Sequence, residues 1–205
     1  MFTNIKKFVT YLLAANFYEV VLVFSVIVVF RDPHLLPFLP LQILWINLAT
    51  DSLPALALST QEAEKDIMER KPVHGELLDG VKGFLIAGGL TGFGLLAVTL
   101  WLYHSDMYLA RTMIVTVSVF YQMLLAINCA SKAPAWKAPG NTTLWWAIIV
   151  SLGLHVALMY SFVGRYFSFQ KLEWEHWAVV AVLGFLGFTI IEAYKILRKY
   201  RIVRV

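Results

Sequence analysis

Two acidic residues, Glu19 and Asp51, lie inside long apolar stretches of this 205-residue chain. Asn16 precedes Glu19 by three residues, so both side chains project from one face of a helix. Thr50 and Asp51 follow Asn47 by three and four residues, so these three side chains share a second helix face. An ionisable group at the centre of a bilayer costs roughly 2.5–3.5 kcal/mol on insertion scales, so intramembrane acids indicate a function.

These two faces offer only oxygen ligands, namely carboxylates, amide oxygens and a hydroxyl. Such a set suits a hard cation such as Ca²⁺, which takes about 6 to 8 oxygens, better than a soft transition metal. The alternative is that the polar groups only hold neighbouring helices together through hydrogen bonds. Two acids with three polar companions and a nearby proline favour the cation site.

That proline is Pro54, three residues beyond Asp51 in the stretch NLATDSLPAL. Proline has no N–H and its ring clashes one turn back, so it frees the carbonyl of Thr50 and loosens the helix near Asp51. Unwound backbone at membrane depth is tolerated where it is buried or lines a cavity, and transporters use it to coordinate ions.

The elements that must position these residues are membrane helices. The chain is 60% hydrophobic and only 15% charged, with a mean hydropathy of +0.70, which excludes a soluble globular protein. Since a span needs about 20 apolar residues, the sequence predicts an all-α membrane protein: one domain over residues 1–205, forming a bundle of six transmembrane helices. The predicted spans are about 8–30, 38–60, 81–103, 110–130, 142–163 and 175–197.

The basic residues predict the orientation of this bundle. Of the 17 Lys and Arg residues, only four fall on one side, Arg31, Arg111, Arg165 and Lys171, and the other 13 fall on the opposite side. Positive residues accumulate on the cytoplasmic side, so we expect both termini and the long loop after the second span in the cytoplasm. The net charge of +4 comes from residues that flank spans, so we expect a lipid bilayer and no nucleic acid as partner.

Other polar residues in the spans are better explained by packing. We expect Asn128 to form an interhelical hydrogen bond, His155 to be a satisfied core residue, and Glu192 to pair with Lys195 one turn later. Small residues permit close approach of helices, and the third span contains five of them: Gly83, Gly88, Gly89, Gly92 and Gly94.

Four stretches carry a resemblance to a known family: AANFYEVV, PLQILWINLATDSLPALAL, DIMERKP and ARTMIVTVSVFYQMLLAINCAS. Over essentially all 205 residues, the chain resembles the last six membrane helices of P-type cation-transporting ATPases, in the calcium-pump (type II) branch. The resemblance implies that these helices supply much of an ion-binding site and that the plasma membrane, the inner membrane of a bacterium, holds the protein.

The resemblance also assigns the family's ligand positions to six residues: Asn16, Glu19, Asn47, Thr50, Asp51 and Gln122. Gln122 stands where the sarcoplasmic-reticulum type of calcium pump has a glutamate, and a neutral amide there also occurs in sodium/potassium-type pumps. Asn47 points the other way, because sodium/potassium-type pumps have an aspartate at that position. On balance the resemblance favours Ca²⁺ as the transported ion.

The 205 residues contain no DKTGT-type phosphorylation loop, actuator TGE loop or hinge GDGxND segment. We therefore expect no ATPase activity from this chain alone, and expect ATP and Mg²⁺ to act only through domains that it lacks. The sequence predicts a fragment or one half of a split pump, whose partner polypeptide carries those domains. The alternative is a non-enzymatic membrane scaffold or regulatory module that packs against a full-length pump. An independent channel or carrier is a third interpretation.

Overall fold

The computed structural model describes residues 2–31, 35–61, 81–131, 133–135 and 141–203, and in this part of the chain it contains helices and no strand. Six helical segments are long and apolar enough to cross a membrane, which confirms the predicted number of spans. Five are single helices: α1 (Phe2–Phe30), α4 (Lys82–Tyr103), α5 (Met107–Ala130), α6 (Thr142–Tyr160) and α7 (Trp174–Val203). A short 3₁₀ helix, η4 (Phe162–Arg165), lies between α6 and α7. The stretch DIMERKP, one of the four that carry the family resemblance, lies outside the described residues.

The second span differs from the continuous helix predicted for it. It consists of α2 (Pro40–Trp45), a π-helical turn η2 (Ile46–Thr50) and α3 (Ser52–Ser59). The Asp51 N–H bonds to the carbonyl of Ile46 at 2.9 Å, five residues back, which defines the wider turn. This break lies one turn before Pro54, in the region where the sequence predicts a loosened helix.

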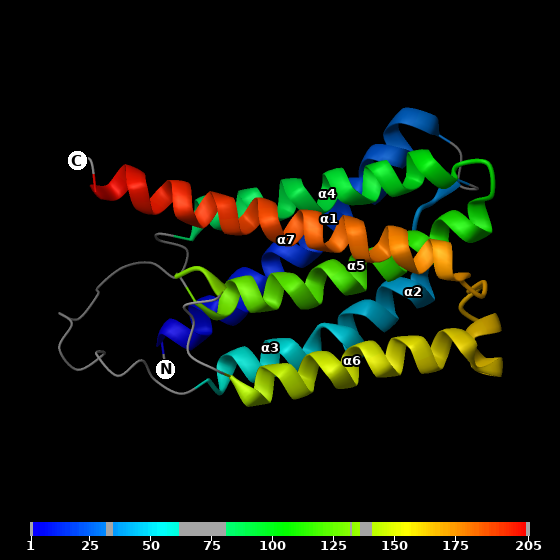
Figure 1. The fold of residues 1–205 in the computed structure, drawn as a ribbon. Coiled ribbons are helices and arrows are strands. Elements are labelled where there is room, and N and C mark those ends of the chain that lie inside the picture. Colours follow the sequence, from blue (N-terminus) through cyan, green and yellow to red (C-terminus); the bar gives the residue numbers. More distant parts are fainter. Residues whose placement is uncertain (1, 32–34, 62–80, 132, 136–140, 204–205) are drawn as a thin grey trace.

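Helix α5 is the centre of the bundle. In its most apolar stretch 83% of the residues are buried, whereas no other span exceeds 44%. It contacts α1, α3, α4, α6 and α7, and Figure 1 shows it running between them. Its polar side chains therefore meet protein and not lipid, as Tyr121 does in donating to the carbonyl of Gly88 in α4 at 2.9 Å.

Helices α1 and α3 are joined at one end of the bundle. The Asn4 amide donates to the carbonyls of Ser59 and Gln61, and the Lys7 ammonium donates to the Gln61 side chain at 3.0 Å. From this joint α1 and α2 diverge toward the other end of the molecule (Figure 1). The start of α1 and the end of α7 lie at the same end, as six spans require.

Two packing predictions have different outcomes. Glu192 and Lys195 form a buried ion pair at 2.8 Å, as predicted. Glu192 also accepts from the N–H of Ala135, and Lys195 donates to the carbonyl of Ala133. The interhelical bond predicted for Asn128 is not found: neither polar atom of this buried amide has a hydrogen-bond partner among the residues that the structure describes.

The glycines of α4 predict a testable asymmetry. A Cβ added at Gly92 would overlap the ring of Tyr18, whereas one added at Gly94 would meet nothing within 4 Å. We expect Gly92→Ala to lower the free energy of unfolding in detergent by about 1–3 kcal/mol, as overpacking does. Gly94→Ala should be neutral or stabilising by up to about 1 kcal/mol, because alanine favours helix. Equal effects of the two substitutions would contradict the packing of α4 on α1.

Candidate cation-binding site

Glu19 is held between α1 and the central helix. Its side chain is only 4% exposed, and Oε1 accepts hydrogen bonds from Gln122 Nε2 at 2.8 Å and from Ser118 Oγ at 3.2 Å. Ser118 is also 3.1 Å from the hydroxyl of Tyr18, which can donate to it. Gln122 and Ser118 are one turn apart on α5, so they present two donors to the same carboxylate oxygen.

Asp51 is completely buried at the junction of η2 and α3. Although it occupies the N-cap position of α3, its side chain makes no capping bond there. Instead Oδ1 accepts a hydrogen bond from the hydroxyl of Tyr11 in α1 at 3.3 Å, and no described residue bonds to Oδ2. The π-helical turn thus directs this carboxylate toward α1, which also carries Glu19.

The two carboxylates are close enough to interact electrostatically, and within the described residues neither has a basic partner. Burying one carboxylate without a counter-charge is costly, and a second one nearby adds repulsion. A cation bound between them would offset both costs, which makes the cluster a candidate site for a positively charged ligand.

Three of the other predicted ligands also lie at this site. Gln122 donates through its nitrogen to Glu19, while its buried Oε1 has no hydrogen-bond partner among the described residues. Asn47 is half-buried, lies one turn before Asp51 and donates to the carbonyl of Ile43 at 3.0 Å. Thr50 is buried beside Asp51 and its hydroxyl donates to Ile46. In each case an oxygen can still accept or coordinate.

Asn16 is the predicted ligand that the structure joins least to this cluster. It is half-buried on α1 and makes no hydrogen bond with the other five residues. Two residues that the sequence reasoning missed, Tyr11 and Ser118, contact the carboxylates directly. The spacing contained a signal for both, because Tyr11 lies eight residues before Glu19 on the same helix face and Ser118 lies four residues before Gln122.

The ligands that this candidate site offers are of the kind that a hard cation prefers, namely carboxylate, amide and hydroxyl oxygens. The described residues contain no group of three or more His, Cys, Asp or Glu that could hold a metal ion, so any ion here would depend on amide and hydroxyl oxygens beside the two carboxylates. The unpartnered oxygens of Asp51 and Gln122 are buried acceptors, and buried acceptors without a partner are rare in proteins. An oxygen-coordinated ion would satisfy them.

Comparison with known proteins shows which family this chain is similar to. The family described as "Cation transporting ATPase, C-terminus" matches residues 35–197. A calcium-transporting ATPase of Bacillus subtilis is 32% identical over 78% of this chain and 19% of its own length. Calcium-transporting ATPase 1 of Bacillus cereus is 27% identical over 97% of this chain and 25% of its length. A sodium/potassium exporting P-type ATPase of Schizosaccharomyces pombe is also 27% identical over 97% of this chain, and 23% of its own length.

The six spans and the family match identify the chain as a multi-pass integral membrane protein. More particularly, the chain belongs to the cation-transporting P-type ATPase family and corresponds to the C-terminal transmembrane domain of its calcium pumps. It spans only about a fifth to a quarter of the length of these relatives, 19% in one and 25% in another.

The hydrogen bond from Tyr11 to Asp51 can be tested by its effect on stability. Tyr11→Phe leaves a second oxygen of a buried carboxylate without a donor, so we expect the free energy of unfolding to fall by about 1–2 kcal/mol. The measurement is reversible unfolding of the detergent-solubilised chain. Tyr166→Phe, at a position that is 75% exposed, is the matched control and should change stability by less than about 0.5 kcal/mol. Indistinguishable variants would argue against the bond.

Proposed function

We propose that this chain forms the cation-binding part of a calcium-transporting P-type ATPase, with Ca²⁺ as the transported substrate. The observation that carries the proposal is the pair of buried carboxylates, Glu19 and Asp51, which come from different spans and have no basic partner among the described residues. The proposed ligands are those that the resemblance assigns: Asn16, Glu19, Asn47, Thr50, Asp51 and Gln122.

Calcium is proposed as the ion for two reasons. The cluster contains two carboxylates, whose charge balances that of one divalent cation. The relatives from the two Bacillus species carry calcium in their names, although the relative from Schizosaccharomyces pombe is named for sodium and potassium. Competition by Na⁺ and K⁺ therefore belongs in any binding assay.

Energy for transport would come from domains that these 205 residues do not include. The relatives are four to five times longer than the segment matched here, and phosphoryl transfer needs groups that hold nucleotide and Mg²⁺. In this proposal, a polypeptide with those domains changes the exposure of the Glu19 and Asp51 site each time ATP is used. The chain would lie in the plasma membrane, as the family resemblance implies, with both termini in the cytoplasm, as its charge distribution predicts.

Calcium titration of the purified chain in nanodiscs tests the proposed site. We expect saturable Ca²⁺ binding that weakens at least about tenfold in Asp51→Asn and in Glu19→Gln, because each loses one charged ligand. Asp106→Asn is the matched control: it removes an exposed carboxylate that caps α5, and asparagine caps as well as aspartate. Unaltered affinity in both site variants would refute the assignment and leave the scaffold interpretation.

Gln122→Glu tests the charge of the site. It places a third carboxylate beside Glu19, so we expect lower thermal stability without calcium and a larger stabilisation when calcium is added. Gln42→Glu is the control, because Gln42 is also buried but bonds to the backbone of Leu39 and Phe167 instead. It should destabilise the chain with no gain in calcium-dependent stabilisation, and the same gain in both variants would count against the site.

The proposed partner can be sought by capture. The chain, expressed with the genes that neighbour it and extracted in mild detergent, should retain a polypeptide that bears a DKTGT-type phosphorylation loop. Recovery of a full-length pump whose association survives Asp51→Asn and Glu19→Gln would instead favour the scaffold.

A further inference from the structure

Helix α6 contacts both ends of the π-helical turn η2. At the end of η2, the Ser151 hydroxyl donates to the carbonyl of Thr50 at 3.2 Å. At its beginning, the indole Nε1 of Trp45 donates to His155 Nδ1 at 3.3 Å. Ser151 and His155 are both buried and lie one turn apart on α6.

The bond from Ser151 replaces one that the second span cannot make. In a regular helix the carbonyl of Thr50 would accept from the N–H of residue 54, but that residue is Pro54 and has no N–H. A buried carbonyl without a donor costs free energy, all the more in a membrane where water is scarce. Ser151 supplies the donor from a different helix.

His155 is fixed on both of its ring nitrogens. The indole N–H of Trp45 can only donate, so Nδ1 must be the acceptor and the ring proton is assigned to Nε2. Nε2 then donates to Thr116 Oγ1 at 3.3 Å, and Thr116 in turn donates to the carbonyl of Thr112 at 2.7 Å. The beginning of η2 is thereby connected through α6 to the central helix α5.

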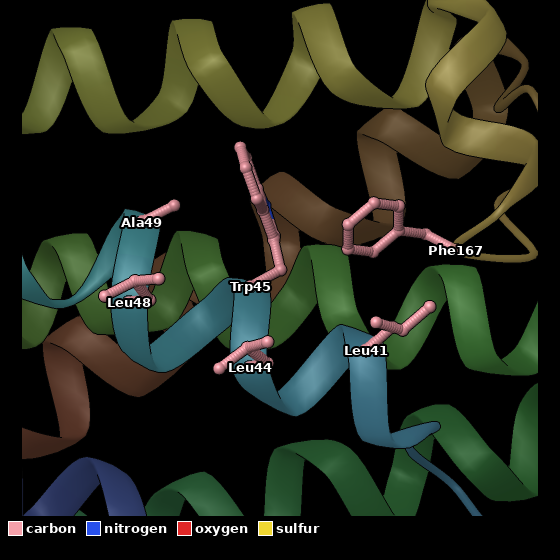
Figure 2. A pocket seen from close by; sticks show the side chains of 6 residues that line it. All are labelled: Leu41, Leu44, Trp45, Leu48, Ala49 and Phe167. Atoms are coloured by element: carbon pink, nitrogen blue, oxygen red, sulfur yellow. The ribbon is translucent and has the colours of Figure 1, made fainter.

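Figure 2 shows the Trp45 side chain extending from the second span toward α6, next to the ring of Phe167. The two rings meet edge to face with centroids 5.9 Å apart. Both rings also line an apolar pocket with Leu41, Leu44, Leu48 and Ala49. This pocket has no polar side chain apart from the indole N–H, which bonds to His155, so the packing there holds Trp45 and offers no ligand to an ion.

We propose that Ser151 and His155 are positioning residues for the cation site, and that they hold η2 in its π-helical form. This inference rests on the proposed function, because η2 carries Asn47 and Thr50 and ends at Asp51. A π-helical turn contains one residue more than an α-helical turn, and one residue of an α-helix corresponds to a rotation of about 100°. Without the two contacts, η2 relaxes toward an α-helix and its ligands rotate relative to α1.

Amide hydrogen exchange and calcium affinity, measured on the full chain in nanodiscs, test this inference together. In Ser151→Ala and in Trp45→Phe we expect the amides of residues 46–51 to exchange about tenfold faster. Calcium affinity should fall about five- to tenfold, and the number of binding sites should stay constant. A constant number distinguishes weaker binding from a general loss of folding, which would reduce it. Ser151→Thr keeps a hydroxyl and should restore both properties.

Ser59→Ala is the matched control, because the Ser59 hydroxyl bonds only within its own turn, to Leu56, in the same span. It should leave exchange at residues 46–51 unchanged. Unchanged exchange in Ser151→Ala and Trp45→Phe, or failure of Ser151→Thr to restore it, overturns the inference whatever the calcium data show. If exchange responds as expected but the wild-type chain binds no calcium, the proposed function fails while the hold of α6 on η2 is established.

Discussion

Two carboxylates buried inside a membrane bundle are the constraint on which the rest of this structure depends. Glu19 and Asp51 have no basic partner among the described residues, so the neutral donors around them must offset part of the cost of burial. Tyr11 donates a hydrogen bond to Asp51, and Ser118 and Gln122 donate hydrogen bonds to Glu19. Placing these donors requires α5 at the centre and a second span that bends its helix at the level of Asp51.

The helical break and the central helix are therefore linked. With any residue other than proline at position 54, a regular helix would supply an N–H to the carbonyl of Thr50 and would not need Ser151. The second span therefore receives a hydroxyl donor and an imidazole acceptor from α6, and His155 in turn bonds to Thr116 of α5. Hydrogen bonds thus join the second span to α1 and α6, and α5 to α1 and α6, so the arrangement depends on the bundle and not on any single helix.

Much of the fold and of the candidate site could be predicted from the sequence, and what could not be predicted has physical reasons. Apolar length predicts six spans, and helical spacing places Asn47 and Asp51 on one face, but neither says which spans meet. The central position of α5 was not predicted, because its apolar content resembles that of α7 and only its burial distinguishes them. The contact of Ser151 was not predicted, because its partner is a backbone carbonyl and a pattern of side chains does not identify such a bond. Whether the six residues ligate an ion stays a prediction.

The joint between α1 and α3 gives the two acid-bearing spans the geometry of a V. Asn4 and Lys7 close it at Ser59 and Gln61, and the arms separate toward the other end of the bundle. Glu19 and Asp51 lie part of the way along these arms, so the gap between the acids varies with the angle of the V. The bond from Tyr11 of α1 to Asp51 crosses between the arms beyond the joint, so the two acid-bearing spans are tied together at two levels.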